Sequence, residues 1–171
     1  MILSLLKIVA FLALCGCTIP NDTNSFESID YSSYWGYYHS IKILNNGKTY
    51  FYYGYDHPTR KLYFSLTLDQ TQLDSINNLL KTLYTIKIDS TYFLMRDSGR
   101  DFGLIIKSKN RRLATLYSGP YSGVTGLSPL FKFVDYIIGL SHKIESSADS
   151  SFVFESKQKL FLLHPPTPDL N

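Results

Sequence analysis

The chain has 171 residues, enough for one domain with a sizeable hydrophobic core. Its formal net charge of +3 is close to neutral, and no stripe of Lys and Arg appears, so the composition argues against a nucleic-acid-binding protein. Both cysteines lie at or before position 17, which excludes a disulfide framework or a cysteine metal site in the rest of the chain.

The N-terminal segment has the pattern of an exported lipoprotein. One positive charge, Lys7, precedes an apolar run from Ile8 to Leu14. That run is too short to span a bilayer, which needs ~20 apolar residues, but it has the length of a signal-peptide core. The segment that follows, Leu14-Cys15-Gly16-Cys17, resembles the lipobox of bacterial lipoproteins, with Leu three positions before the modified Cys and a small residue just before it.

This resemblance implies that residues 1–16 are a signal peptide and that the Cys17 thiol carries an acyl group such as palmitate. The expected partner is therefore the membrane, and the expected location is the bacterial cell envelope. Thr18 stands where an Asp-based retention signal would be, which favours the outer membrane over the inner one. Residues 17–33 are predicted to be the lipidated Cys and a flexible tether, because they are polar and rich in turn formers. An ordinary secretory signal with an incidental Cys is the alternative.

Residues 34–141 are predicted to form an α+β domain, beginning with three strands. Tyr37 to Leu44 and Thr49 to Tyr55 favour strands around the turn Asn45-Asn46-Gly47-Lys48, because Asn-Gly tolerates the positive φ of a tight hairpin. Lys61 to Leu68 alternates apolar and polar residues, which indicates a strand with one buried face.

Two helices are predicted, each after a group of strands. Asp69 and Gln72 form a capping box for a helix from about Gln70 to Tyr84, and its apolar residues fall on one face. A second hairpin, residues 101–117, precedes a helix that starts near Ser128-Pro129. The predicted fold is an antiparallel sheet with two helices packed on one face, an α+β two-layer sandwich.

The last thirty residues are predicted to add little regular structure. Two short apolar runs within residues 142–164 predict a C-terminal hairpin, and residues 165–171 are predicted to be an extended Pro-rich tail.

Three stretches of the chain resemble a family of uncharacterised domains of small bacterial lipoproteins. They are Ile41–Tyr50, Leu66–Leu73 and Asp101–Ile106, and the region that resembles the family is about Tyr34 to Leu140. The resemblance implies a small α+β lipoprotein domain and carries no assigned activity.

No catalytic motif stands out, so we predict that the protein is not an enzyme and has no cofactor or metal site. The four histidines lack metal-ligand spacing, and no Gly-x-Ser-x-Gly nucleophile elbow occurs. A tight basic cluster falls at the second predicted hairpin turn, where a solvated turn is favoured over a phosphate site: Lys107, Lys109, Arg111 and Arg112.

Tyrosine is the residue type that departs most from an average composition, with 14 copies. Alternate side chains of a strand point to opposite faces, so Tyr50 and Tyr52 share one face while Phe51 takes the other. We expect one set to enter the core and the other to be exposed. Tyr63 and Trp35 join Tyr50 and Tyr52 in a candidate interaction surface, because Tyr and Trp are enriched at interfaces.

Three interpretations of these aromatic residues stay open. They can be ordinary sheet residues, since Tyr has good strand propensity, or a protein-contact surface, or rings that stack on sugars. The predicted function is a membrane-anchored envelope lipoprotein that acts as a non-enzymatic protein-interaction or accessory module, with an envelope protein as its partner. The alternative is a carbohydrate-binding lipoprotein that holds a glycan with exposed Tyr and Trp.

Overall fold

The computed structural model describes residues 25–34, 37–55, 61–93, 100–120, 124–141, 146–147 and 153–160. Cys17 and Trp35 lie outside these ranges, as do the predicted signal peptide and Pro-rich tail. In chain order, the described elements are β1 (Ser28–Tyr34), β2 (Tyr37–Leu44), β3 (Lys48–Tyr55), β4 (Lys61–Thr67), α2 (Gln70–Leu83), β5 (Thr91–Phe93), β6 (Arg100–Ser108), β7 (Arg111–Gly119), α3 (Ser128–Leu140), β8 (Ser146–Ser147) and α4 (Glu155–Leu160).

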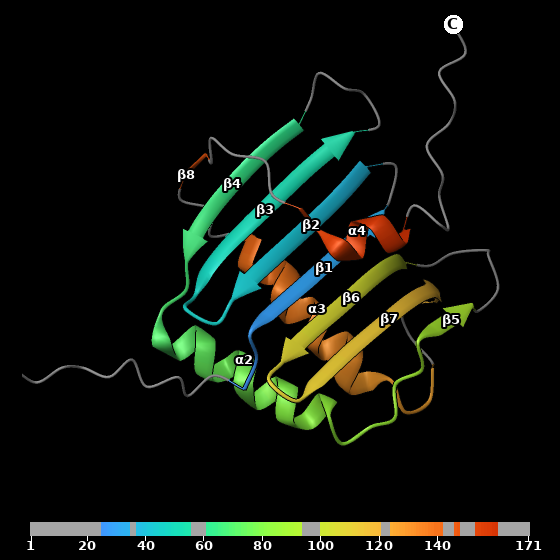
Figure 1. Ribbon diagram of the computed structural model, residues 1–171. Helices are drawn as coiled ribbons and strands as arrows, with labels where there is room; N and C mark the ends of the chain where they lie inside the picture. Colours follow the sequence, from blue (N-terminus) through green and yellow to red (C-terminus); the bar gives the residue numbers. More distant parts are fainter. Residues whose placement is uncertain are drawn as a thin grey trace, which may run out of the picture.

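The described strands form one sheet in the order β5-β7-β6-β1-β2-β3-β4-β8 (Figure 1). Neighbouring strands pair antiparallel, apart from β5 and β7, which are parallel. The meander β2-β3-β4 and the hairpin β6-β7 lie on either side of β1, so the first strand of the described chain is central. The predicted α+β class is confirmed.

The predicted tether is wrong for residues 28–33, which belong to β1. This strand pairs with β2 and β6 along its length, and the side chains of Ile29 and Tyr31 are fully buried. The polar residues Asp30 and Ser32, which suggested a linker, are buried as well and hydrogen-bonded to α4. Their partners come from the far end of the chain, so the short alternation of Ile29 and Tyr31 with polar residues is the one local pattern that indicates a strand here.

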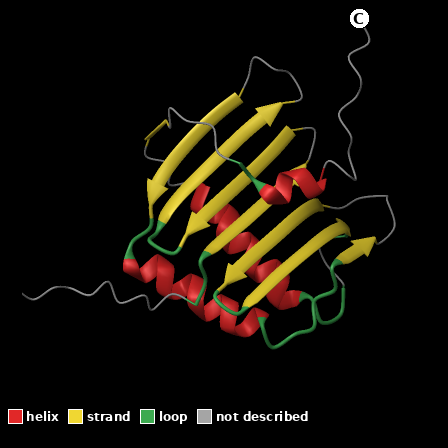
Figure 2. Cartoon of the chain, in the orientation of Figure 1, coloured by secondary structure: helices red, strands yellow, loops and turns green. Residues whose placement is uncertain are grey.

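Side chains of α2 and α3 share a hydrophobic core with the strands, and both helices lie on the same side of the sheet (Figure 2). The capping box of α2 is confirmed: Gln72 N donates to Asp69 Oδ1 at 2.8 Å, and Asp69 N donates to Gln72 Oε1 at 2.9 Å. None of the helices among the described residues has the length and apolar character needed to cross a membrane. The buried residues of the two helices are Leu73, Ile76, Leu80 and Leu83 of α2, and Leu130, Phe131, Phe133, Val134, Ile137 and Leu140 of α3.

The turn between β2 and β3 follows the prediction. Gly47 has φ +82°, the left-handed conformation that glycine adopts without steric cost. A Cβ at this position would also lie 2.9 Å from the backbone oxygen of Leu68, so the turn packs closely on the segment that leads into α2.

Residues 142–164 differ from the predicted C-terminal hairpin. Their described parts are the short strand β8, which pairs with β4, and the helix α4. The α4 sequence contains good helix formers, with Glu155 in its first turn and Lys157 and Lys159 in its last, which suits the helix dipole. Figure 1 shows α4 on the side of the sheet opposite α2 and α3. The prediction of two helices on one face of the sheet therefore missed α4, which lies on the other face.

Candidate functional site

The sheet face that carries α4 also carries a group of tyrosines, which we call the aromatic face: Tyr34, Tyr38, Tyr50, Tyr52 and Tyr63. The register places Tyr34 opposite Tyr38, with ring centroids 4.8 Å apart, and Tyr52 opposite Tyr63, at 5.1 Å. Phe51 points to the other face and is fully buried in the main core. The predicted division of these side chains between two faces is confirmed.

The expectation that this set is exposed is wrong at Tyr52, which is only 3% exposed. Phe154, just before α4, packs near its ring with centroids 6.2 Å apart. The ring of Tyr52 is covered by Phe154 and by Lys157, because residues 155–160 form a helix instead of a hairpin strand. Tyr50 and Tyr63 are half-buried and lie on β3 and β4, while α4 packs mainly over β1, β2 and β6.

Two tyrosines hold a cation from α4. The Lys157 ammonium lies 3.9 Å from the Tyr52 ring centroid and 4.7 Å from that of Tyr38. A cation over the face of an aromatic ring is attracted by the ring quadrupole, and the attraction strengthens when the pair is desolvated. Leu160 fills the same cluster from the end of the helix. The covered part of the aromatic face thus accommodates an aromatic, a cationic and an aliphatic side chain.

A buried polar network fixes the start of α4 on the sheet. The Asp30 carboxylate accepts hydrogen bonds from Glu155 N at 2.8 Å, Ser156 N at 3.3 Å and the Ser156 hydroxyl. Asp30 therefore caps a helix from which it is separated by 125 residues of sequence. The network continues through Ser32 Oγ, 2.8 Å from Ser156 Oγ, to Ser40 Oγ at 2.7 Å.

Burial raises the pKa of Asp30, and the hydrogen bonds from Ser156 and Glu155 oppose this rise only in part. Glu155 has the opposite shift: the hydrogen bond from Lys107 holds its pKa below the ordinary value, with Arg112 adding to the effect at 3.5 Å. The Lys42 ammonium donates to the backbone oxygen of Val153 at 3.1 Å, one residue before Phe154.

Gly103 of β6 permits the close approach of α4. A Cβ at this position would lie 2.8 Å from the backbone oxygen of Ser156, which is closer than real Cβ atoms come to other atoms. A side chain here would therefore push the helix away from the sheet, since the clash is with backbone rather than with a flexible side-chain end.

Of the four predicted surface residues, the structure brings together Tyr50, Tyr52 and Tyr63, and Trp35 lies outside the described residues. Sequence reasoning missed Asp30, Ser156 and Lys157. Their roles depend on α4, and the alternation of Ile29 and Tyr31 with polar residues was the one local signal that β1 exists.

The chain matches no protein-family model, and comparison with curated proteins also finds no match. The resemblance to small lipoprotein domains and the acylation of Cys17 stay predictions.

Proposed function

We propose that the protein is a lipid-anchored, non-enzymatic accessory protein of the bacterial cell envelope that binds a protein partner through its aromatic face. Cys17 supplies the anchor, in the outer membrane rather than the inner one. In this proposal the sheet with α2 and α3 is a two-layer α+β sandwich that provides the rigid support, and the opposite face is the binding surface.

The observation that carries the proposal is the pair Tyr50 and Tyr63. These half-buried rings lie on neighbouring strands β3 and β4, beside the part of the face that α4 covers. Tyr offers a large apolar area with a polar tip and few rotatable bonds, which suits it to protein interfaces. Since the covered part already binds Phe154, Lys157 and Leu160, we expect the partner to present apolar and cationic side chains to the rest.

The test is crosslinked capture of partners from detergent-solubilised envelope with the tagged full chain. We expect Tyr50→Ala with Tyr63→Ala to lose a stoichiometric partner, because truncating an aromatic anchor of an interface commonly costs ~2 kcal/mol or more, a loss of about 30-fold in affinity. Tyr136→Ala is the matched control, because Tyr136 is also half-buried but lies on α3.

Thermal unfolding of each variant separates binding from folding. The proposal requires the double variant to remain folded while capture is lost and the Tyr136→Ala chain to keep its partner. Recovery of the same partner by all three chains, or of no stoichiometric partner by the unsubstituted chain, would overturn it.

Glycan binding is the less well supported alternative. Stacking on a sugar needs an open ring face, and Lys157 and Phe154 already contact the Tyr52 ring. A glycan that stacks on Tyr50 and Tyr63 would quench tyrosine fluorescence in the unsubstituted chain and not in the double variant.

A further inference from the structure

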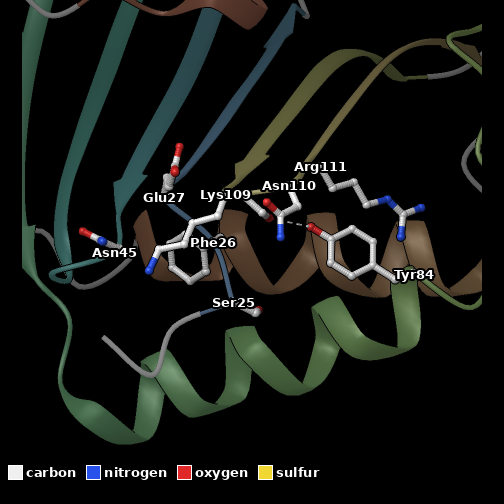
Figure 3. A pocket seen from close by; sticks show the side chains of 9 residues that line it. Ser25, Phe26, Glu27, Asn45, Tyr84, Lys109, Asn110 and Arg111 are labelled. Atoms are coloured by element: carbon white, nitrogen blue, oxygen red, sulfur yellow. Dashed lines mark hydrogen bonds between the residues drawn. The ribbon is translucent and has the colours of Figure 1, made fainter. Parts of the chain in front are cut away.

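A pocket of about 300 Å³ lies at the end of the sheet where β1 begins (Figure 3). Four segments that are distant in sequence line it: residues 25–27 before β1, Asn45 in the β2–β3 turn, Tyr84 at the end of α2, and residues 108–111 in the β6–β7 turn. Glu27 N donates to Lys107 O at 2.7 Å, and Asn45 N donates to Glu27 O at 3.1 Å. Backbone hydrogen bonds therefore connect residues 25–27 to Asn45 and to the strand residue that precedes the β6–β7 turn.

Two of the four cations of the basic cluster line this pocket, and the other two do not. Lys107 and Arg112 are paired with Glu155 of α4. Lys109 and Arg111 are exposed, and both line the pocket. The basic cluster, which the sequence predicts to be one solvated turn, therefore has two parts. Lys107 and Arg112 form ion pairs with α4, and Lys109 and Arg111 line the pocket.

The side chain of Arg111 is held in place by Tyr84. Its guanidinium carbon lies 4.2 Å from the centroid of the Tyr84 ring, and the Tyr84 hydroxyl is 3.3 Å from Ser108 Oγ (Figure 3). A guanidinium held over a ring still presents N–H donors, and their fork geometry fits two oxygens of a phosphate. The Lys109 ammonium adds a second positive charge, so the lining stays net positive against its one carboxylate, Glu27. Phe26, 2% exposed, gives the lining an apolar part.

The pocket lies close to where the predicted anchor enters the domain. Ser25, which lines it, follows Cys17 by eight residues. Eight residues span at most about 29 Å when fully extended, so an acylated Cys17 would keep this end of the sheet near the membrane surface. Anionic head groups attract Lys and Arg side chains that come within about one Debye length, ~8 Å at physiological salt.

We propose that this pocket binds the phosphate head group of an anionic phospholipid in the membrane that holds the anchor. Arg111 donates to the phosphate oxygens, the Lys109 ammonium attracts the head group by its charge, and Asn110 adds an amide donor. This inference rests on the lipid anchor of the proposed function and deepens it. A domain bound by this end stands with its strands directed away from the bilayer, and the aromatic face is then accessible to a partner from the side.

The experiment uses the full chain with Cys17→Ser, which removes the acylation site. Its flotation is measured with vesicles of phosphatidylcholine alone and of phosphatidylcholine mixed with phosphatidylglycerol. The readout is the affinity for anionic vesicles divided by the affinity for neutral vesicles. An apolar contribution from residues 1–16 to membrane binding is the same for the two kinds of vesicle and cancels in this ratio. We expect Lys109→Ala with Arg111→Ala to lower this ratio by about fivefold for each cation removed, about 25-fold in all.

A matched control removes the same charge elsewhere, with Lys132→Ala on α3 and Lys159→Ala on α4. The proposal requires this chain to keep its preference for anionic vesicles. An equal loss in both double variants would show attraction by net charge alone, and no preference in the unsubstituted chain would also overturn the proposal. Lys109→Glu, a single change at an exposed turn, is the second variant and should reduce the ratio even where the double variant folds poorly.

Inorganic phosphate distinguishes a lipid site from a site for the free anion. Binding of inorganic phosphate that Arg111→Ala abolishes, in a chain that shows no preference for anionic over neutral vesicles, would assign the pocket to the free anion and overturn the lipid proposal. Because no partner and no acyl group take part, this measurement can fail while capture through the aromatic face succeeds, or the reverse.

Discussion

At the scale of single residues, Asp30 has the least expected role. A carboxylate on a central strand is costly to bury unless hydrogen bonds compensate for its lost hydration. Here the compensation comes from the first turn of α4, through two backbone N–H groups and one hydroxyl. The same hydrogen bonds satisfy backbone N–H groups at the N-terminus of α4, a helix of only six residues. The Asp30 carboxylate and these N–H groups therefore each lower the free-energy cost of burying the other.

The raised pKa of Asp30 predicts that part of the stability of the fold depends on pH. An acid whose pKa is higher in the folded state binds more protons there, so its contribution to stability is complete below the unfolded value of 3.8 and is lost as pH rises through the raised value. Asp30→Asn removes this titration and keeps an acceptor oxygen. The free energy of unfolding of the parent chain minus that of the variant should therefore fall as pH rises through this window.

Urea unfolding of both chains at a series of pH values measures this difference. Glu155 titrates in both chains, so its effect largely cancels in the subtraction. A difference that increases with pH would mean that the hydrogen bonds outweigh desolvation and that the pKa of Asp30 is lowered.

At the scale of elements, the sequence predicts the parts whose pattern is local. Three such patterns occupy the same short stretch of chain as the element that they predict. They are the alternation in Lys61–Leu68, the Asn-Gly turn and the Asp69–Gln72 capping box. The strand β1 and the helix α4 depend on each other across more than a hundred residues, so neither has a complete local signal. The same dependence explains the candidate site, where the orientation of Tyr52 was predictable and its burial was not.

The contact between α4 and β6 gives a prediction at this scale. Gly103→Ala places a methyl group against the backbone of Ser156, and overpacking of this kind typically costs ~1–3 kcal/mol. We expect a lower unfolding midpoint in urea. We also expect faster hydrogen exchange in α4 and quenchable fluorescence from Tyr38 and Tyr52, because displacement of the helix exposes both rings.

Gly139→Ala on α3 is the matched control. Nothing lies within 4 Å of a Cβ at that position, and Ala favours a helix over Gly by ~1 kcal/mol, so this variant should be as stable as the parent or more stable. Equal hydrogen exchange of α4 in the Gly103→Ala chain and in the parent would contradict the view that glycine is required for the contact.

At the scale of the whole molecule, the two faces and the two ends of the sheet differ in character. One face shares the main core with α2 and α3, and the other carries the aromatic face and α4. The end where the described chain begins also holds the pocket with Lys109 and Arg111. Since β1 pairs on both sides along its length, residue 25, where the described chain begins, leads directly into the centre of the sheet.

The proposed lipid anchor gives the last prediction, and the nearby cysteines Cys15 and Cys17 make it specific. In cells fed labelled palmitate, the parent chain should be labelled and should partition into membranes, because two or more acyl chains give stable binding where one gives only reversible binding. Cys17→Ala should lose the label and the partitioning, whereas Cys15→Ala should keep both, because Gly16 supplies the small residue before Cys17 and Leu14 before Cys15 does not. Label that persists in Cys17→Ala would place the acyl group elsewhere. The distance from the anchor to the pocket would then no longer favour a membrane head group, although the vesicle measurement would still test the pocket itself.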